Sequence, residues 1–282
     1  MTLIAFVGSV FSPFYHAARK AGGRADPMDH CAINMAVYRR PGRAWAFSEW
    51  PRTMVERQTD VLRIGASTLG WSGDVLEARI DERRVGPWGR IRGTLRVHPM
   101  SLVGIPHFLD ERSRHTWWPV APSARIEVDL EEPSLRFTGT GYHDANAGSR
   151  ALERDFRSWT WSRASLERGT AVLYDVVRRE GRPLRLSRFF PAAGGEPVDV
   201  SAPQEAVLST TPWRTRRSIR TDGEPPRVIR TLEDSPFYAR SLVETGLGGE
   251  RVTAMHEALD LDRFTNPLMQ WMLPYRIRRP RF

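Results

Sequence analysis

Apolar and polar residues alternate with a period of two along much of this 282-residue chain. In residues 124–130, every second residue is Ala, Ile, Val or Leu, and Arg, Glu and Asp stand between them. The same alternation recurs in three shorter segments, residues 76–81, 91–97 and 184–186. Successive side chains of a strand point to opposite faces, so each segment predicts a half-buried antiparallel strand.

Turn-forming residues separate these predicted strands, at 82–84, 131–134 and 180–182. Helical periods are scarce and predict only two short turns, at residues 15–20 and 151–156. Many short strands at this spacing favour an all-β fold of the antiparallel barrel or sandwich type.

The length allows one large domain or two smaller ones. We place a boundary in the polar stretch after the long hairpin, which predicts domains at 1–150 and 151–282. A rival boundary is the Pro- and Gly-rich stretch 191–203.

The formal net charge is +9, and Lys20 is the only lysine among the 42 basic residues. Three interpretations are open: nucleic-acid binding, a coding bias toward Arg, and attraction to an anionic membrane surface. No nucleic-acid-binding motif accompanies the charge, so we expect no nucleic-acid partner.

The single cysteine, Cys31, excludes an intrachain disulfide, a Cys-rich zinc site and an iron–sulfur cluster held by the chain's own thiolates. No dinucleotide-binding glycine motif follows a strand, and no histidine pair has zinc-helix spacing. His98 and His107 are weak ligand candidates. The apolar segment 3–11 is too short to span a bilayer and lacks preceding positive charge, so we interpret it as a core strand of a cytoplasmic protein.

Ten Trp residues against six Tyr point either to core packing or to an aromatic-lined pocket for a long apolar ligand. Two residue pairs carry candidate chemistry. His115 and Trp117 share one strand face, as do Tyr142 and Asp144. The hairpin around 131–134 would bring these pairs within reach of each other, with Asp144 near Ala121.

The alternation of side chains between the two faces of a strand complicates this picture. Leu135 and Phe137 occupy odd positions, whereas Tyr142 and Asp144 occupy even ones, so one regular strand cannot place them all on one face. A bulge at residues 139–141 would change the face, or the strand ends there. Asp144 could alternatively belong to a turn or cap a helix.

Several segments together resemble the carotenoid 1,2-hydratase family, also called hydroxyneurosporene synthases. They are FVGSVFSPFY (6–15), DHCAIN (29–34), HTWWPVAP (115–122), GYHDANAG (141–148), WTWSRA (159–164), SPFYAR (235–240) and MLPYR (272–276). The resemblance covers nearly the whole chain. One departure is the lack of the family's aromatic-rich strand before Leu3.

The resemblance implies two lipocalin-like β domains and a hydratase that needs no cofactor and no metal. Its substrate would be an acyclic carotene of the neurosporene or lycopene type, and its functional residues map onto His115, Trp117, Tyr142 and Asp144. Chemistry then suggests roles: a buried Asp144 donates the proton, and Trp117 faces the cation. His115 or Tyr142 handles the water.

A carrier of an apolar polyene, or another carbocation or pericyclic enzyme on the same fold, remains an alternative function. Because the substrate partitions into membranes and the chain is rich in Arg, we also expect peripheral attachment to a membrane surface. The oligomeric state is left open.

Overall fold

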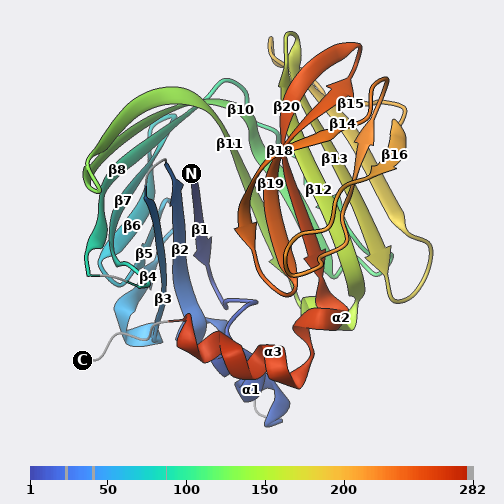
Figure 1. Ribbon diagram of the computed structural model, residues 1–282. Helices are drawn as coiled ribbons and strands as arrows, with labels where there is room; N and C mark the ends of the chain where they lie inside the picture. Colours follow the sequence, from blue (N-terminus) through green and yellow to red (C-terminus); the bar gives the residue numbers. More distant parts are fainter. Residues whose placement is uncertain (23–24, 40–41, 87, 278–282) are drawn as a thin grey trace. The chain divides into compact units, whose positions relative to one another are not determined.

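The computed structural model describes residues 1–22, 25–39, 42–86 and 88–277, and these residues are mostly antiparallel strands (Figure 1). The predicted all-β class, with few short helices, is confirmed. The α-helices are α1 (Pro13–Lys20), α2 (Leu261–Phe264) and α3 (Pro267–Met272). The 3₁₀ turns are Pro27–His30, Arg52–Met54, Leu152–Arg154 and Leu273–Tyr275.

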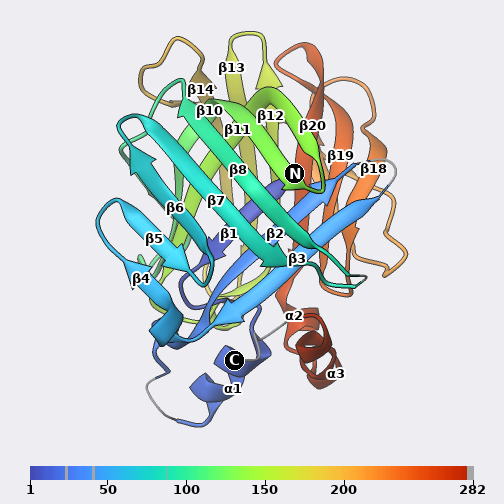
Figure 2. The same ribbon diagram turned by 90° about the vertical axis from the view of Figure 1, so that its left-hand side faces the viewer.

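The strands form four sheets in the described residues. The first has the order β1 (Thr2–Phe6), β2 (Cys31–Tyr38), β3 (Arg43–Trp50). The second has the order β11 (Leu135–Gly148), β10 (His115–Glu132), β8 (Arg90–Pro99), β7 (Val75–Arg83), β6 (Ser67–Ser72), β5 (Val61–Ile64), β4 (Val55–Arg57), and β9 (His107–Phe108) pairs with β10. Figure 2 shows β8 to β4 running side by side.

The third sheet has the order β15 (Val198–Asp199), β14 (Leu184–Pro191), β13 (Gly169–Arg178), β12 (Phe156–Leu166), β20 (Glu250–Asp260), β19 (Tyr238–Leu247), β18 (Arg227–Asp234). The fourth pairs β16 (Gln204–Val207) with β17 (Ser218–Thr221). Every one of these sheets is open within the described residues. The predicted choice between barrel and sandwich therefore resolves toward open, packed sheets.

The alternation that predicted the strands reappears as burial. In β10, Ala124, Val128 and Leu130 are buried, whereas Arg125 and Asp129 between them are exposed. The predicted strands at 76–81, 91–97 and 184–186 lie in β7, β8 and β14. Both predicted helical turns are also present, as α1 and as the 3₁₀ turn Leu152–Arg154.

The predicted strand at 3–11 is wrong in its second half. The strand β1 ends at Phe6, and Ser12 then begins helix α1. The hydroxyl of Ser12 accepts a hydrogen bond from the backbone N–H of Tyr15 over 3.0 Å, and Pro13 occupies the first helical position. An N-cap Ser followed by Pro is a strong helix-start signal, which outweighs the apolar run before it.

The chain forms two compact units that interleave in sequence. The first comprises residues 1–98, 125–140 and 270–282, and the second comprises 99–124 and 141–269. They interleave because β10 and β11 each have residues in both units. A compact unit is not the same as an independently folding domain, so the boundary at 150, with its rival at 191–203, stays a prediction.

Each unit has its own core. In the first unit, side chains of the β1–β3 sheet pack against those of β7, β8 and β10. The members buried there are Met35, Val37, Ala44, Ala46, Ala78, Ile80, Ile91, Leu95, Val128 and Leu130. In the second unit, Leu208 and Ile219, from the segment that contains β16 and β17, pack on the long sheet around Leu173 and Val243. Burial of such aliphatic side chains contributes roughly 1.5–3 kcal/mol each.

Candidate active site

Three polar side chains from two neighbouring strands meet in the second unit: Trp117 of β10, and Tyr142 and Asp144 of β11. The Trp117 indole donates from Nε1 to Asp144 Oδ2 over 3.0 Å, and Nε1 lies 3.2 Å from Tyr142 Oη. The hydroxyl of Tyr142 donates to the same carboxyl oxygen over 3.1 Å. The structure thus brings together three of the four residues that the sequence singled out.

Asp144 lies within β11, four residues before the strand ends at Gly148. Its interpretation as a turn or helix-cap residue is therefore wrong. Its hydrogen-bond partner on β10 is Trp117, and the expected position of Asp144 near Ala121 stays a prediction. The bulge proposed at residues 139–141 stays a prediction.

Burial controls the acid strength of this cluster. Asp144 is half-buried, and this burial raises its pKa to about 6; the charge of Glu257 adds to the rise, and hydrogen bonds from Trp117 and Tyr142 oppose it. Burial also raises the pKa of Tyr142 well above its ordinary value, so the phenol stays protonated. A carboxyl with a pKa near 6 keeps a fraction of its protons at neutral pH, which a solvated aspartate does not.

Aromatic rings surround the cluster. Trp117, 1% exposed, packs edge-on against Tyr174 with centroids 5.8 Å apart, and stacks on His107 at 5.3 Å. Trp161 lies 5.3 Å from the Tyr142 ring. Tyr174 escaped the sequence analysis because its segment is a plain apolar strand. Its register opposite Trp161 in β12 brings it here.

Arg163 was also missed, although it lies in the WTWSRA segment. Its Nη2 donates to the backbone carbonyl of Gly141 over 3.1 Å, directly before Tyr142 in the chain. Its guanidinium carbon lies 5.8 Å from the Tyr142 ring centroid. Arg163 therefore fixes the backbone that carries the phenol, and the arginine–aromatic contact stabilises the ring position.

The sequence analysis also missed the charged pair Arg240 and Glu257, which face each other across β19 and β20. Arg240 is 4% exposed, and its Nη2 lies 2.7 Å from Glu257 Oε1. Their charges act on Asp144 in opposite directions, since Glu257 raises the pKa of Asp144 and Arg240 lowers it. Arg240 ends the SPFYAR segment, which carries the family resemblance but suggested no chemistry, and Glu257 stands in none of the resembling segments.

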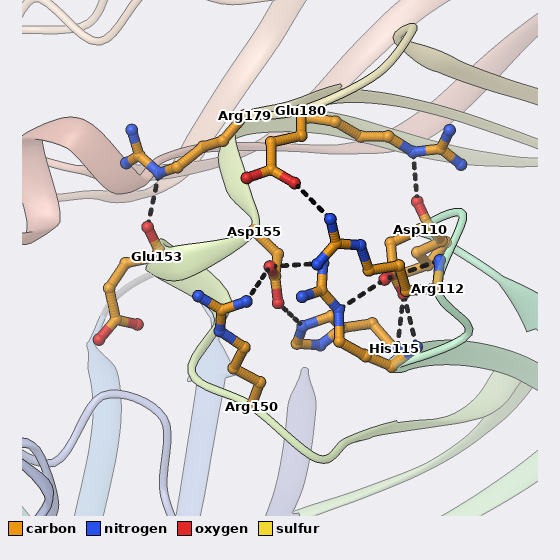
Figure 3. A network of polar contacts seen from close by, with 11 residues as sticks. Asp110, Arg112, His115, Arg150, Glu153, Asp155, Arg179 and Glu180 are labelled. Carbon is orange, nitrogen blue, oxygen red and sulfur yellow. Dashed lines mark hydrogen bonds and ion pairs between the residues drawn. The ribbon is translucent and has the colours of Figure 1, made fainter.

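His115 belongs to a different cluster (Figure 3). Its Nε2 lies 2.8 Å from Asp155 Oδ2, and its ring packs against Phe156 at a centroid distance of 4.8 Å. Its Nδ1 is buried and has no hydrogen-bond partner among the described residues. Neither ring nitrogen is thus bonded to Asp144, which corrects the expectation that all four side chains form one group.

The separation follows from the strand geometry. A Cβ added to Gly148 would lie 2.5 Å from His115 Nδ1, so His115 packs against the end of β11. Gly148 stands four residues beyond Asp144, a spacing of about 13 Å along a strand. His115 and Trp117 share a face of β10, but they contact different residues of β11. His115 packs against Gly148, whereas Trp117 bonds to Asp144.

Metal-ligand candidates find other partners. His98 Nε2 lies 3.4 Å from Glu127 Oε1, and His107 stacks on Trp117. No group of three His, Cys, Asp or Glu side chains positioned to hold a metal ion occurs in the part of the chain that the structure describes. Among the same residues, no helix is both long enough and apolar enough to cross a membrane. Two open hollows are lined by residues between 204 and 251, and the predicted aromatic pocket is not among them.

A family model described as "Carotenoid hydratase CrtC" matches residues 3–282. The chain belongs to this family. A protein named acyclic carotenoid 1,2-hydratase from Thiocapsa roseopersicina is 45% identical over 281 residues, which is 99% of this chain and 69% of that protein. A protein of the same name from Cereibacter sphaeroides is 38% identical and covers 99% of this chain and 98% of its own length.

Two weaker similarities concern other proteins. The quinolone epoxide rearrangement protein asqO of Emericella nidulans is 43% identical over 94 residues, 33% of this chain and 25% of that protein. A solved structure from Nitrosomonas europaea, described as an AttH protein, is 10% identical with a TM-score of 0.49 and covers 81% of this chain and 84% of its own.

Proposed function

We propose that this CrtC-family chain is an acyclic carotenoid 1,2-hydratase, a hydro-lyase. It adds water across the terminal double bond of a neurosporene- or lycopene-type carotene and gives a tertiary 1-hydroxy product. The names of relatives at 38–45% identity over nearly the whole chain support the substrate class. The observation that carries the chemistry is Asp144, a carboxyl with a pKa of about 6 among aromatic side chains.

The first step is protonation of the alkene. Both donors to Asp144, from Trp117 and Tyr142, reach Oδ2, which leaves Oδ1 to carry the acidic proton. The alkene π electrons take this proton at the less substituted carbon, and the positive charge stays on the tertiary carbon. The two donors stabilise the carboxylate that results, and the Trp117 face stabilises the cation by roughly 0.5–2 kcal/mol.

The second step is capture by water. A water oxygen shares an electron pair with the tertiary carbon, and the oxonium then passes one proton to the Tyr142 oxygen. The hydroxyl proton of Tyr142 moves at the same time to the Asp144 carboxylate, so the enzyme ends as it began. The apolar side chains around Trp117 limit other water, which protects the cation from side reactions.

These proton transfers use only side chains and water, and we therefore propose that hydration needs no metal or organic cofactor. Activity should survive exhaustive dialysis against a chelator. Complete loss that only an added metal ion restores would contradict this part of the proposal.

The proposed substrate partitions into membranes. We therefore propose that the protein is cytoplasmic and attaches peripherally to anionic lipid through its arginines. Sedimentation with anionic vesicles should weaken as salt rises, because the screening length shortens to about 8 Å at physiological ionic strength. Pelleting that does not respond to salt would indicate apolar insertion instead.

The decisive assay is incubation with lycopene or neurosporene in detergent, followed by mass analysis. A hydratase adds the mass of one water for each end that reacts. Unchanged polyene would indicate a carrier, and a product of equal mass with a shifted spectrum would indicate an isomerase or a pericyclic enzyme. The short similarity to a rearrangement protein makes the last outcome the rival to test.

A further inference from the structure

The His115 cluster joins two buried carboxylates, Asp110 and Asp155, to the more exposed arginines Arg114 and Arg150 in the second unit. Asp155, with a side chain 4% exposed, uses Oδ2 for His115 Nε2. Its other oxygen, Oδ1, accepts from Arg114 Nη2 at 2.8 Å and faces Arg150 Nη1 at 3.3 Å. Asp110 accepts from the backbone N–H of His115 over 2.9 Å and from Arg114 Nε over 3.0 Å.

A proton on both ring nitrogens of His115 would leave a buried Nδ1–H with no acceptor among the described residues. An unsatisfied buried donor costs roughly 1–3 kcal/mol. A ring with its single proton on Nε2, where Asp155 accepts it over 2.8 Å, avoids this cost.

We propose that Asp155 is a positioning residue for His115: by accepting the Nε2 proton, it fixes the neutral tautomer in which Nδ1 is a hydrogen-bond acceptor. Asp155 lies 40 residues from His115 in the chain, directly after the 3₁₀ turn Leu152–Arg154. The turn and the two arginines fix the carboxylate, and the carboxylate fixes the ring.

Gly148 completes this arrangement. Its missing side chain lets the Nδ1 edge of His115 approach the backbone of β11, since a Cβ there would lie 2.5 Å from Nδ1. The Nδ1 lone pair therefore lies beside a bare backbone, and no protein donor among the described residues occupies it.

This inference deepens the proposed function and rests on it for one consequence. A ring with Nδ1 unprotonated and its Nε2 proton bonded to Asp155 has no proton to give to an alkene, so the alkene proton comes from Asp144. The ring packs against Gly148 and thereby holds the end of β11, the strand that carries Asp144.

The test is an exchange of Asp155 for asparagine. Arg114 and Arg150 both require an acceptor at the Oδ1 position, so the amide oxygen of Asp155→Asn will turn toward them. The amide NH₂ then faces His115 Nε2, which must become the acceptor, and the ring proton moves to Nδ1. The matched control is Asp110→Asn, which removes the same charge from the same cluster but contacts only the backbone of His115.

Two-bond ¹H–¹⁵N spectra of histidine-labelled protein report which ring nitrogen carries the proton, and loss of signals in His115→Gln assigns them. We expect Nε2–H in the wild type and in Asp110→Asn, and Nδ1–H in Asp155→Asn. Melting curves establish that each variant is folded. Wild-type protein protonated at Nδ1, or Asp155→Asn spectra identical to wild type, would overturn the proposal.

The hydration assay separates this proposal from the function it rests on. Asp155→Asn should lower kcat by roughly 10- to 100-fold with KM changed less than about threefold, the scale of a lost orienting hydrogen bond. An inverted tautomer with wild-type kcat would overturn the positioning role. Wild-type protein that hydrates no acyclic carotene would refute the proposed function, while the spectra would still decide the tautomer.

Discussion

The indole Nε1 of Trp117 lies 3.0 Å from carboxyl oxygen Oδ2 of Asp144, on the neighbouring strand. The hydrogen bond favours the anion, whereas burial favours the neutral acid, and burial prevails because the pKa of Asp144 rises to about 6. The same indole thus tunes the pKa of Asp144, and in the proposed mechanism its ring face also stabilises the cation. These two effects can be separated by substitution.

Asp144→Asn should lower hydration by at least about 100-fold, because the amide keeps the shape but has no acidic proton. The melting temperature should change little. Asp129→Asn is the control, since Asp129 forms a surface ion pair with Arg136 in the first unit. Steady-state turnover of both variants provides the measurement, and an Asp144→Asn enzyme of near-wild-type rate would exclude Asp144 as the acid.

The pH profile should carry the signature of a raised carboxyl pKa. Only the protonated Asp144 donates, so kcat/KM should fall as pH rises above about 6, by roughly tenfold per pH unit. Trp117→Phe removes a hydrogen bond that lowers this pKa, so the descending limb should move to higher pH. The maximal rate should drop about tenfold, less than in Asp144→Asn.

Trp161→Phe is the matched control for that shift. Trp161 packs against Tyr142, but its own Nε1 has no hydrogen-bond partner among the described residues. The descending limb of the pH profile should therefore stay at the same pH in Trp161→Phe, whatever the substitution does to the rate. Equal shifts in the two variants would show that the indole hydrogen bond does not set the acid strength.

Glu82 in the first unit predicts a pH-dependent stability. The residue is 1% exposed, and burial raises its pKa from 4.5 to about 7 despite hydrogen bonds from Ser48 and Ser67. Between these values the folded state holds a proton that the unfolded state releases. The free energy of unfolding should therefore fall as pH rises from about 4.5 to about 7, by about 3 kcal/mol in all.

Glu82→Gln should abolish that fall and make the protein more stable than wild type above pH 7. Denaturant titrations at pH 5 and pH 8 measure the difference. Glu77→Gln on the same strand is the control, because hydrogen bonding to Arg79 lowers the pKa of Glu77. A wild-type protein whose stability does not decline between these pH values would refute the prediction.

Gly148→Ala should displace the His115 ring, since the new methyl would lie 2.5 Å from Nδ1. We expect a loss of about 1–3 kcal/mol in unfolding free energy from overpacking, and a lower kcat. Gly139→Ala on the same strand is the control, because its Cβ would meet only the Phe137 ring at 3.9 Å. Equal effects of the two substitutions in thermal melts and assays would show that His115 does not need Gly148.

The sequence by itself determined the strand class and part of the candidate site. Period-two alternation reflects the burial of one strand face, so it located β7, β8 and β10 before any contact was known. The same rule placed Tyr142 and Asp144 on one face, where they meet Trp117. It could not set the register, and it wrongly brought His115 into that group.

Only the tertiary structure decided the partners across strands and between distant segments. Tyr174 reaches Trp117, and Asp155 reaches His115, through sheet order and a 3₁₀ turn that no local pattern encodes. The interleaving of the two compact units has the same origin, because β10 and β11 have residues in both. Alternation fixes which face a side chain takes, whereas strand pairing fixes what it meets there.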